Sequence, residues 1–307
     1  MEDKKIEIKA AICGNENGID GNASAQDLLK DAVIDTETVI LPPGPMSPEE
    51  VRFEKVTVTG GEVDCREGNV NGFACRGGEW VIKDTKINVG GEIGNDFIGL
   101  GAGILIEGDT AATIEGVEIH CDGAARTPIV AKEKARIFVK DAVLTTEDGD
   151  LAPDYVGSVF PEKMKSSPWM LGVNGNARAT NLMGQGVATY YNSDIKAEKW
   201  GVLSTDDNTG VRLWAINSNA MISGGAKPIE EIYANAAAGK FDFYEDEIDH
   251  VFPEGEWQDT TKPSGYGTYS IGDTTVTIAG STMVVPDYIA IVANGPASLI
   301  LTSSEPS

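Results

Sequence analysis

Val58–Val63 reads VTGGEV, Ile82–Ile87 reads IKDTKI and Ile114–Ile119 reads IEGVEI, and this six-residue unit decides the fold. Each copy has apolar ends around a small or polar middle, with Gly or Asp at the third position. Such a unit suits two short strands that meet at a sharp bend and bury both ends in one core. Four further copies follow: Val139–Leu144 (VKDAVL), Leu182–Val187 (LMGQGV), Ile216–Met221 (INSNAM) and Ile278–Met283 (IAGSTM).

A unit repeated this often is typical of a solenoid, in which each repeat stacks on the previous one. A second apolar stretch precedes each copy by about eight residues, as Gly103–Ile106 and Trp200–Leu203 do, and a pair of turn residues follows it. We therefore predict an all-β, right-handed parallel β-helix. Each coil would consist of a strand, a tight turn, a strand, a bend and a strand.

Residues 1–52 differ from the repeats and are predicted to form a cap, with the coils over residues 53–307. Ser24–Asp27 has the pattern of a capping box, and the apolar series after it, up to Val33, predicts a short amphipathic helix. Thr38–Leu41 predicts a strand. This order of helix, strand and first coil resembles the amino-terminal cap of the pectin-lyase-like right-handed parallel β-helix superfamily. The resemblance concerns architecture and implies no substrate.

The interval between successive units varies, whereas the approach to each unit is nearly constant, so the extra length enters after the second strand of a unit. The two longest insertions lie at about 145–167 and 223–264. Because they leave the array at the same corner, we expect them to stack on one face and to line a groove. The alternative is that they only shield an edge or pack between subunits.

The chain is strongly acidic, with 48 Asp and Glu against 24 Lys and Arg and a net charge of −24. This charge repels nucleic acid and anionic membranes, so neither is an expected partner. It also disfavours a polyanionic substrate. No apolar stretch resembles a signal sequence or reaches the ~18 residues of a membrane-spanning helix, so we expect a cytoplasmic protein. A secreted protein whose signal has been removed is the alternative.

No metal or cofactor motif stands out. The four cysteines lack zinc-type spacing and are expected to be reduced. The second insertion carries an acidic run from Phe241 to Asp259, and carboxylates are ligands that calcium prefers. The spacing is not that of an EF-hand. We therefore expect a solvated loop and no cofactor, with a calcium site as the alternative.

The catalytic motifs of two pectin-lyase-like enzyme families are incomplete here. Asp206-Asp207 matches the aspartate pair of polygalacturonases, but their Gly-His-Gly and Arg-x-Lys motifs are absent. Arg126–Val130 matches the first half of the Arg-x-Pro-x-x-Arg stretch of pectate lyases, but Ala131 replaces the second arginine. Neither activity is implied, and Asp206-Asp207 is expected to be a solvated turn.

Polar residues that follow the third and fifth units are expected to converge on the corner that bears the insertions, because equivalent positions on neighbouring coils lie about 4.8 Å apart. Three residues are predicted to carry acid/base chemistry: His120, Asp122 and Asp194. Five residues are predicted to bind the substrate: Tyr190, Tyr191, Lys196, Trp169 and His250. A solvated bend with tyrosines under a loop is the alternative interpretation.

The leading functional hypothesis is a carbohydrate-active enzyme that acts on a neutral or weakly charged glycan or glycoside, as a hydrolase, transglycosylase, lyase or epimerase. The alternative is a non-catalytic structural or adhesion-type module, or a subunit of a larger β-helix assembly. The last coil, Ser298–Leu301, is followed by no capping element, which leaves an open sheet edge. We expect further chain, a partner chain or a second copy to cover it.

Overall fold

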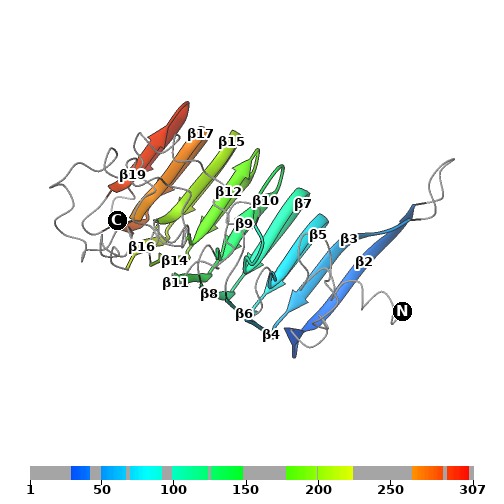
Figure 1. Ribbon diagram of the computed structural model, residues 1–307. Coiled ribbons are helices and arrows are strands. Elements are labelled where there is room, and N and C mark those ends of the chain that lie inside the picture. Colours follow the sequence, from blue (N-terminus) through cyan, green and yellow to red (C-terminus); the bar gives the residue numbers. More distant parts are fainter. Residues whose placement is uncertain are drawn as a thin grey trace, which may run out of the picture.

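The computed structural model describes residues 29–41, 50–66, 70–91, 99–123, 126–147, 178–198, 200–223, 265–285 and 289–303. Within these ranges the chain forms two sheets and no helix, so the prediction of an all-β chain with parallel strands is confirmed. Figure 1 shows the strands side by side in an elongated array, with β2 and β3 at one end and β19 at the other. No helix that would be long and apolar enough to cross a membrane occurs in this part of the chain.

The smaller sheet has eight strands, of which β1 pairs antiparallel with β4 and all later neighbours pair in parallel. In spatial order its strands are β1 (Leu29–Lys30), β4 (Glu62–Cys65), β6 (Lys86–Gly90), β8 (Glu118–Asp122), β11 (Val143–Glu147), β14 (Asp194–Ala197), β16 (Asn219–Ile222) and β18 (Thr282–Val284).

The larger sheet has twelve strands, and only its first pair, β2 with β3, is antiparallel. Its strands are β2 (Val33–Leu41), β3 (Glu50–Thr59), β5 (Phe73–Lys83), β7 (Ile104–Glu115), β9 (Ile129–Ala131), β10 (Arg136–Lys140), β12 (Thr180–Gly184), β13 (Val187–Tyr191), β15 (Trp200–Ile216), β17 (Gly265–Ala279), β19 (Ile289–Asn294) and β20 (Ala297–Thr302). The long strands β5, β7, β15 and β17 each span the width that two shorter strands, such as β9 and β10, cover elsewhere.

The chain crosses repeatedly from the larger sheet to the smaller one, and each described crossing takes two residues, as Gly60-Gly61 does between β3 and β4. Six of the seven six-residue units lie at these corners. Leu182–Val187 does not, because it joins β12 to β13 within the larger sheet. The fifth corner is instead Tyr190–Ile195, whose first buried end is a tyrosine. The sixth is Ala215–Ala220, one residue earlier than predicted, since Met221 is exposed.

The first residue of every crossing adopts the left-handed backbone conformation that makes the chain turn sharply. These residues, all Gly, Asp or Asn, are Gly60, Asp84, Gly116, Asp141, Asn192, Asn217 and Gly280, with φ between 49° and 70°. Glycine pays no steric penalty there, and Asn and Asp tolerate it better than other residues. The Gly, Asp or Asn in the middle of the repeated unit is therefore explained by the left-handed backbone conformation that the corner requires.

At the last three crossings the second corner residue is a serine, and these serines form a column of hydroxyl groups. The Ser193 backbone N–H donates to Ser218 Oγ at 3.1 Å, and the Ser218 N–H donates to Ser281 Oγ at 3.0 Å. Each of these hydroxyls in turn donates to carbonyls at the end of the preceding strand, as Ser218 does to Ile216. The column thus pairs backbone groups that the bend removes from the sheet.

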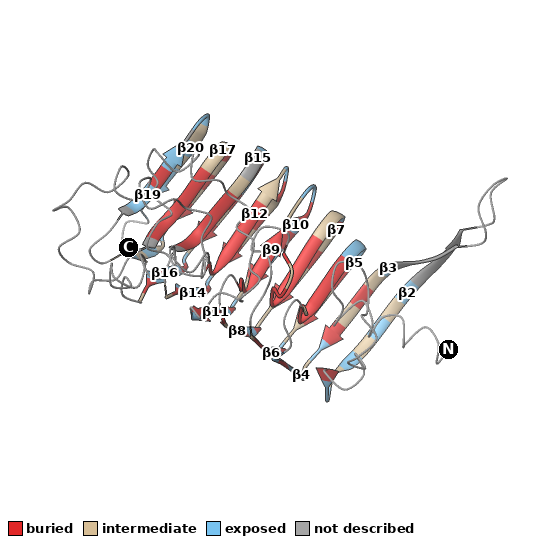
Figure 2. Ribbon diagram, in the orientation of Figure 1, coloured by how far each residue is buried: buried red, intermediate tan, exposed pale blue. Residues whose placement is uncertain are grey.

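Apolar side chains stack between the sheets in two columns that run through successive strands. Figure 2 shows the buried residues as a continuous band from β5 to β17. The column of the larger sheet consists of Val58, Ile82, Ile114, Val139, Tyr190, Ala215 and Ile278. The facing column of the smaller sheet consists of Val63, Ile87, Ile119, Leu144, Ile195 and Ala220.

Two local predictions are corrected. The helix expected to continue to Val33 is absent from residue 29 onward, because Leu29–Lys30 forms β1 and the chain enters β2 at Val33; residues 1–28 lie outside the described part. Leu29 is buried opposite Val63 of β4, so its apolar side chain packs as part of an edge strand. The tight turn expected at Asp206-Asp207 is a β-bulge inside the continuous strand β15. The strand predicted at Thr38–Leu41 is confirmed as part of β2.

Candidate functional site

A pocket of about 470 Å³ lies beside the smaller sheet, where β8, β11, β14 and β16 end. Its lining residues are His120, Thr145, Thr146, Glu147, Lys196, Glu198 and Ser223. The two longest connections of the chain begin directly after Glu147 and Ser223, although residues 148–177 and 224–264 themselves lie outside the described part. The pocket therefore occupies the corner from which the sequence predicts the insertions to leave.

Strand alternation brings the polar side chains to this surface. In β8, Ile119 and Cys121 point into the core, so His120 between them is only partly buried. In β14, Ile195 and Ala197 are buried and Lys196 is exposed. Parallel register then places Thr145 directly between His120 and Lys196 on the intervening strand β11.

A hydrogen bond fixes the His120 ring. Its Nδ1 lies 2.9 Å from Thr145 Oγ1, and the Thr145 hydroxyl donates to the carbonyl of Ile119 at 3.3 Å. When the Thr145 hydroxyl donates to Ile119, its oxygen is free to accept from Nδ1–H of the imidazole. In that tautomer the ring presents the lone pair of Nε2, the atom that can take up a proton.

Two carboxylates and one ammonium group complete the pocket. Glu147 is exposed and Glu198 is partly buried, two residues beyond Thr145 and Lys196 respectively. The Glu198 N–H donates to the carbonyl of Thr146 at 3.0 Å, which holds the two chain segments together where the strands end. The pocket thus combines a proton acceptor, carboxylates and a cation on three adjacent strands, the residue types that acid/base chemistry uses.

The predicted acid/base residues are only partly brought together. His120 lines the pocket. Asp122 lies in register with Glu147 on the neighbouring strand, but its carboxylate forms an ion pair with Arg66 Nη1 at 2.8 Å. Asp194 is exposed at the start of β14 and accepts a hydrogen bond from Asn219 Nδ2 at 2.6 Å. Neither aspartate is among the residues that line the pocket.

The substrate-binding predictions need a larger correction. Lys196 lines the pocket as predicted. Tyr190 does not, because it is 1% exposed and its side chain belongs to the core column of the larger sheet. Burial raises the pKa of its phenol, which also argues against a role in proton transfer. Tyr191 is partly buried on the larger sheet, away from His120. Trp169 and His250 lie outside the described residues.

The sequence interpretation missed five of the seven residues that line the pocket: Thr145, Thr146, Glu147, Glu198 and Ser223. Thr145, Glu147 and Glu198 occupy the first or third position after Leu144 or Ile195, the buried ends of two corners, and so correspond to His120 and Asp122 after Ile119. Recognising Tyr190–Ile195 as the fifth corner would have aligned Glu198 with Glu147. Thr145 and Glu147 follow the correctly placed Val139–Leu144 unit, so the signal for them was present in the sequence.

The residues that match catalytic motifs of known enzymes have structural roles. Arg126 is fully buried, and its Nε donates to the carbonyl of Gly91 at 2.8 Å while its Nη1 donates to that of Gly101 at 2.9 Å. Asp206 accepts from the buried Arg178 at 2.7 Å. Arg126 and Asp206, the residues that match pectate-lyase and polygalacturonase motifs, are therefore engaged in structural contacts and do not line the pocket.

In the described residues, no group of three or more His, Cys, Asp or Glu side chains is arranged to hold a metal ion. No protein-family model, curated protein or solved structure matches this chain. The chemistry of the pocket is therefore the basis for any functional proposal.

Proposed function

We propose that this chain is a right-handed parallel β-helix of the pectin-lyase-like kind. Three features support the proposal: the parallel register, the two-residue corners and the stacked core columns. The right-handed sense rests on the general rule that crossovers between parallel strands are right-handed in about 98% of cases. In such an architecture polar outward positions of successive coils form rows, and the residues around His120 form one.

We further propose that the chain is a carbohydrate-active enzyme and that its glycan binds in the pocket of His120. The observation that carries this proposal is the pocket itself, which places an oriented imidazole beside two glutamates and a lysine on adjacent strands. A neutral or weakly charged glycan fits the net charge of −24 better than a polyanion does.

Five of the residues that line the pocket have roles in the proposed chemistry. His120 Nε2 accepts a proton from the sugar or from an attacking water, with Thr145 holding the ring. Glu147 or Glu198 donates the proton to the leaving oxygen, and the Lys196 ammonium orients hydroxyl groups. General acid and base groups of this kind typically contribute factors of about 10²–10⁴ in rate each.

The test is product release from a library of neutral and weakly charged oligosaccharides, detected by mass spectrometry. We expect the full chain to convert at least one glycan, and His120→Ala to lower that rate by about 10²-fold or more. Asn88→Ala is the matched control, because Asn88 lies in register with His120 on the neighbouring strand but does not line the pocket. It should retain the full rate.

Two results would overturn the proposal. If no glycan in the library is converted, the structural-module alternative is favoured. If a glycan is converted and His120→Ala works as fast as Asn88→Ala, the chain is an enzyme whose site lies elsewhere.

A further inference from the structure

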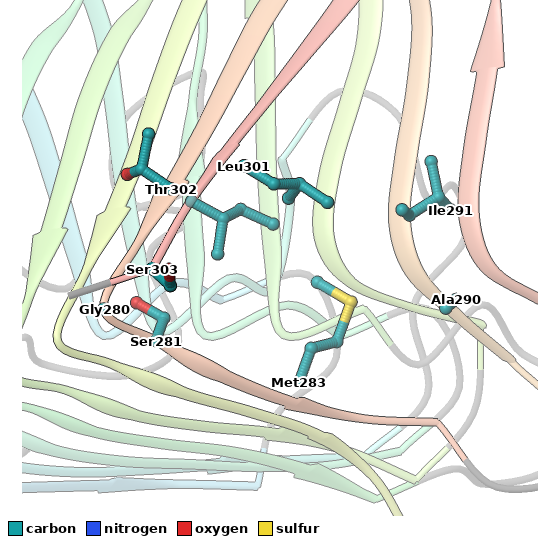
Figure 3. Close-up of a pocket in the computed structure, with 9 residues that line it drawn as sticks. Gly280, Ser281, Met283, Ala290, Ile291, Leu301, Thr302 and Ser303 are labelled. Carbon is teal, nitrogen blue, oxygen red and sulfur yellow. The ribbon is translucent and has the colours of Figure 1, made fainter. Parts of the chain in front are cut away.

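The end of the array formed by β18, β19 and β20 exposes the cross-section of the core. A pocket of about 730 Å³ opens there, between Met283 of the smaller sheet and Leu301 of the larger one. Figure 3 shows Met283 projecting toward this opening from below, with Leu301, Thr302 and Ile291 around it. Leu301 lies in register with Ile278, so it continues the buried column, yet it is 60% exposed.

Apolar exposure is concentrated at this end. Among the described residues eight large hydrophobic side chains are exposed, and four of them, Val284, Ile291, Ile300 and Leu301, belong to its strands. Ile291 and Leu301 line the open pocket together with Met283, whereas Val284 and Ile300 continue the outward rows of Met221 and Thr277. An exposed apolar patch such as the one at this pocket marks a contact site.

The backbone edges at this end are also unpaired within the described residues. β18 pairs only with β16, and β19 and β20 pair only with β17. At the opposite end both sheets finish differently: β1 and β2 add antiparallel strands to β4 and β3. An antiparallel strand supplies partners for the exposed N–H and C=O groups of an edge and ends the winding.

The charge pattern indicates which molecule would supply such a strand. Residues 280–303 contain one charged residue, Asp287, whereas 23% of the whole chain is charged. A basic partner would find almost no carboxylates here. A second copy of this chain, repelled elsewhere by a net charge of −24, meets the least repulsion at this end and offers the same uncharged edges.

We infer that this end is the contact surface of a two-fold symmetric dimer of the chain. An axis normal to the sheets places each β18 antiparallel to its copy, and each β20 likewise, so that both sheets continue through the dimer. A two-fold interface uses the same patch on both subunits, as a self-complementary edge requires. Leu301 and Met283 then become buried against their counterparts. This inference does not depend on the glycan site.

Sedimentation equilibrium of the full chain tests the inference. We expect a species of twice 32.5 kDa whose dissociation constant falls as salt is added, since salt screens the repulsion between two acidic subunits. Leu301→Asp should weaken the dimer by at least 10-fold, because it buries two unpaired carboxylates at the contact. Val33→Asp is the matched control: Val33 is 70% exposed in β2, at the opposite end of the array, and its substitution should leave the dimer intact.

Circular dichroism melting of each variant distinguishes loss of association from loss of folding. If Leu301→Asp does not fold, Ile291→Lys in β19 replaces it, since Ile291 also lines the open pocket and its side chain is already 40% exposed. A wild-type chain that stays monomeric at all concentrations overturns the inference. So does a dimer that survives both substitutions at the open pocket or that dissociates in Val33→Asp.

Discussion

At the scale of single residues, burial decides which charges matter for stability. Arg178 is 1% exposed and forms an ion pair with Asp206 Oδ2 at 2.7 Å, and its guanidinium carbon lies 5.6 Å from the centre of the Tyr269 ring. Lys86 and Glu118 form a pair at 3.3 Å with both side chains more than half exposed. The Arg178–Asp206 pair is largely shielded from water, so each charge is stabilised mainly by the other. The Lys86–Glu118 pair remains solvated.

Removing Arg178 should therefore cost far more than removing Lys86. We expect Arg178→Ala to lower the free energy of unfolding by about 3–5 kcal/mol, because it leaves the Asp206 carboxylate in a mostly buried position without its cation. Lys86→Ala should change it by less than about 1 kcal/mol. Urea denaturation of both variants measures the difference. Equal losses would show that the Arg178 pair is as solvated as the surface pair.

Glu107 gives the chain an acid-sensitive contact. Burial alone would raise the pKa of this carboxyl, but hydrogen bonds from Arg76 and from Lys132 at 3.0 Å outweigh it and lower the pKa. A carboxyl whose pKa is lower in the folded state stabilises the fold above its unfolded pKa, about 4.3, and that contribution is lost as the pH falls through the folded pKa.

The expected consequence is a pH-dependent effect of Glu107→Gln. Its loss in unfolding free energy relative to wild type should be constant at neutral pH and should shrink as the pH falls below about 4, where the native carboxyl is protonated too. Urea midpoints measured from pH 7 to pH 3 give this profile. A loss that grows on acidification would mean that the pKa is raised.

At the scale of the element, the corner is the unit that the sequence encodes. Asn217 occupies the first corner position before β16 with φ of 49° and is exposed, so its backbone conformation can be tested almost without disturbing packing. We expect Asn217→Val to destabilise the fold by about 1–2 kcal/mol, because a β-branched residue resists the left-handed conformation. Asn217→Gly should be neutral within about 0.5 kcal/mol or slightly stabilising.

The same substitutions at Asn219, two residues later in β16, provide the comparison. Asn219 is exposed and extended, so there valine should be tolerated and glycine should be the worse residue. Thermal unfolding of the four variants checks the reversal. If valine and glycine rank in the same order at both positions, the corner conformation is not what selects Asn217.

The corners also explain how much of the fold the sequence could predict. Apolar ends around a Gly, Asp or Asn predict the bend because the left-handed residue and the two buried ends are both local requirements. The pattern missed the corner that begins with Tyr190, because a tyrosine in the sequence was interpreted as a substrate-binding residue. In the structure its hydroxyl is hydrogen-bonded to Thr180 inside the core. Leu29 shows a second limit of prediction from the sequence. The short series of apolar residues around it fits either a helix or an edge strand, and only the pairing with β4 distinguishes the two.

At the scale of the whole molecule, the register between neighbouring parallel strands determines which polar residues meet. His120 and Lys196 are 76 positions apart in sequence, yet Thr145 alone separates them across the sheet. The sequence could predict that pair from the corner. Glu198 was missed because one misplaced unit shifted the alignment of β14, whereas Glu147 follows the correctly placed Val139–Leu144 unit. Asp122 and Asp194 were predicted from proximity alone, and their contacts with Arg66 and Asn219 depend on register.

The central proposal, a glycan site at His120, is tested most directly by the ring signals of that histidine in nuclear magnetic resonance spectra. The chain has two histidines, so His250→Gln leaves a single imidazole to follow. We predict that titration with a glycan that the chain converts shifts the His120 ring signals in a saturable way. The shift should disappear when Lys196→Ala and Glu147→Gln are combined. His120 signals that stay unchanged while the same glycan is being converted would contradict the proposal.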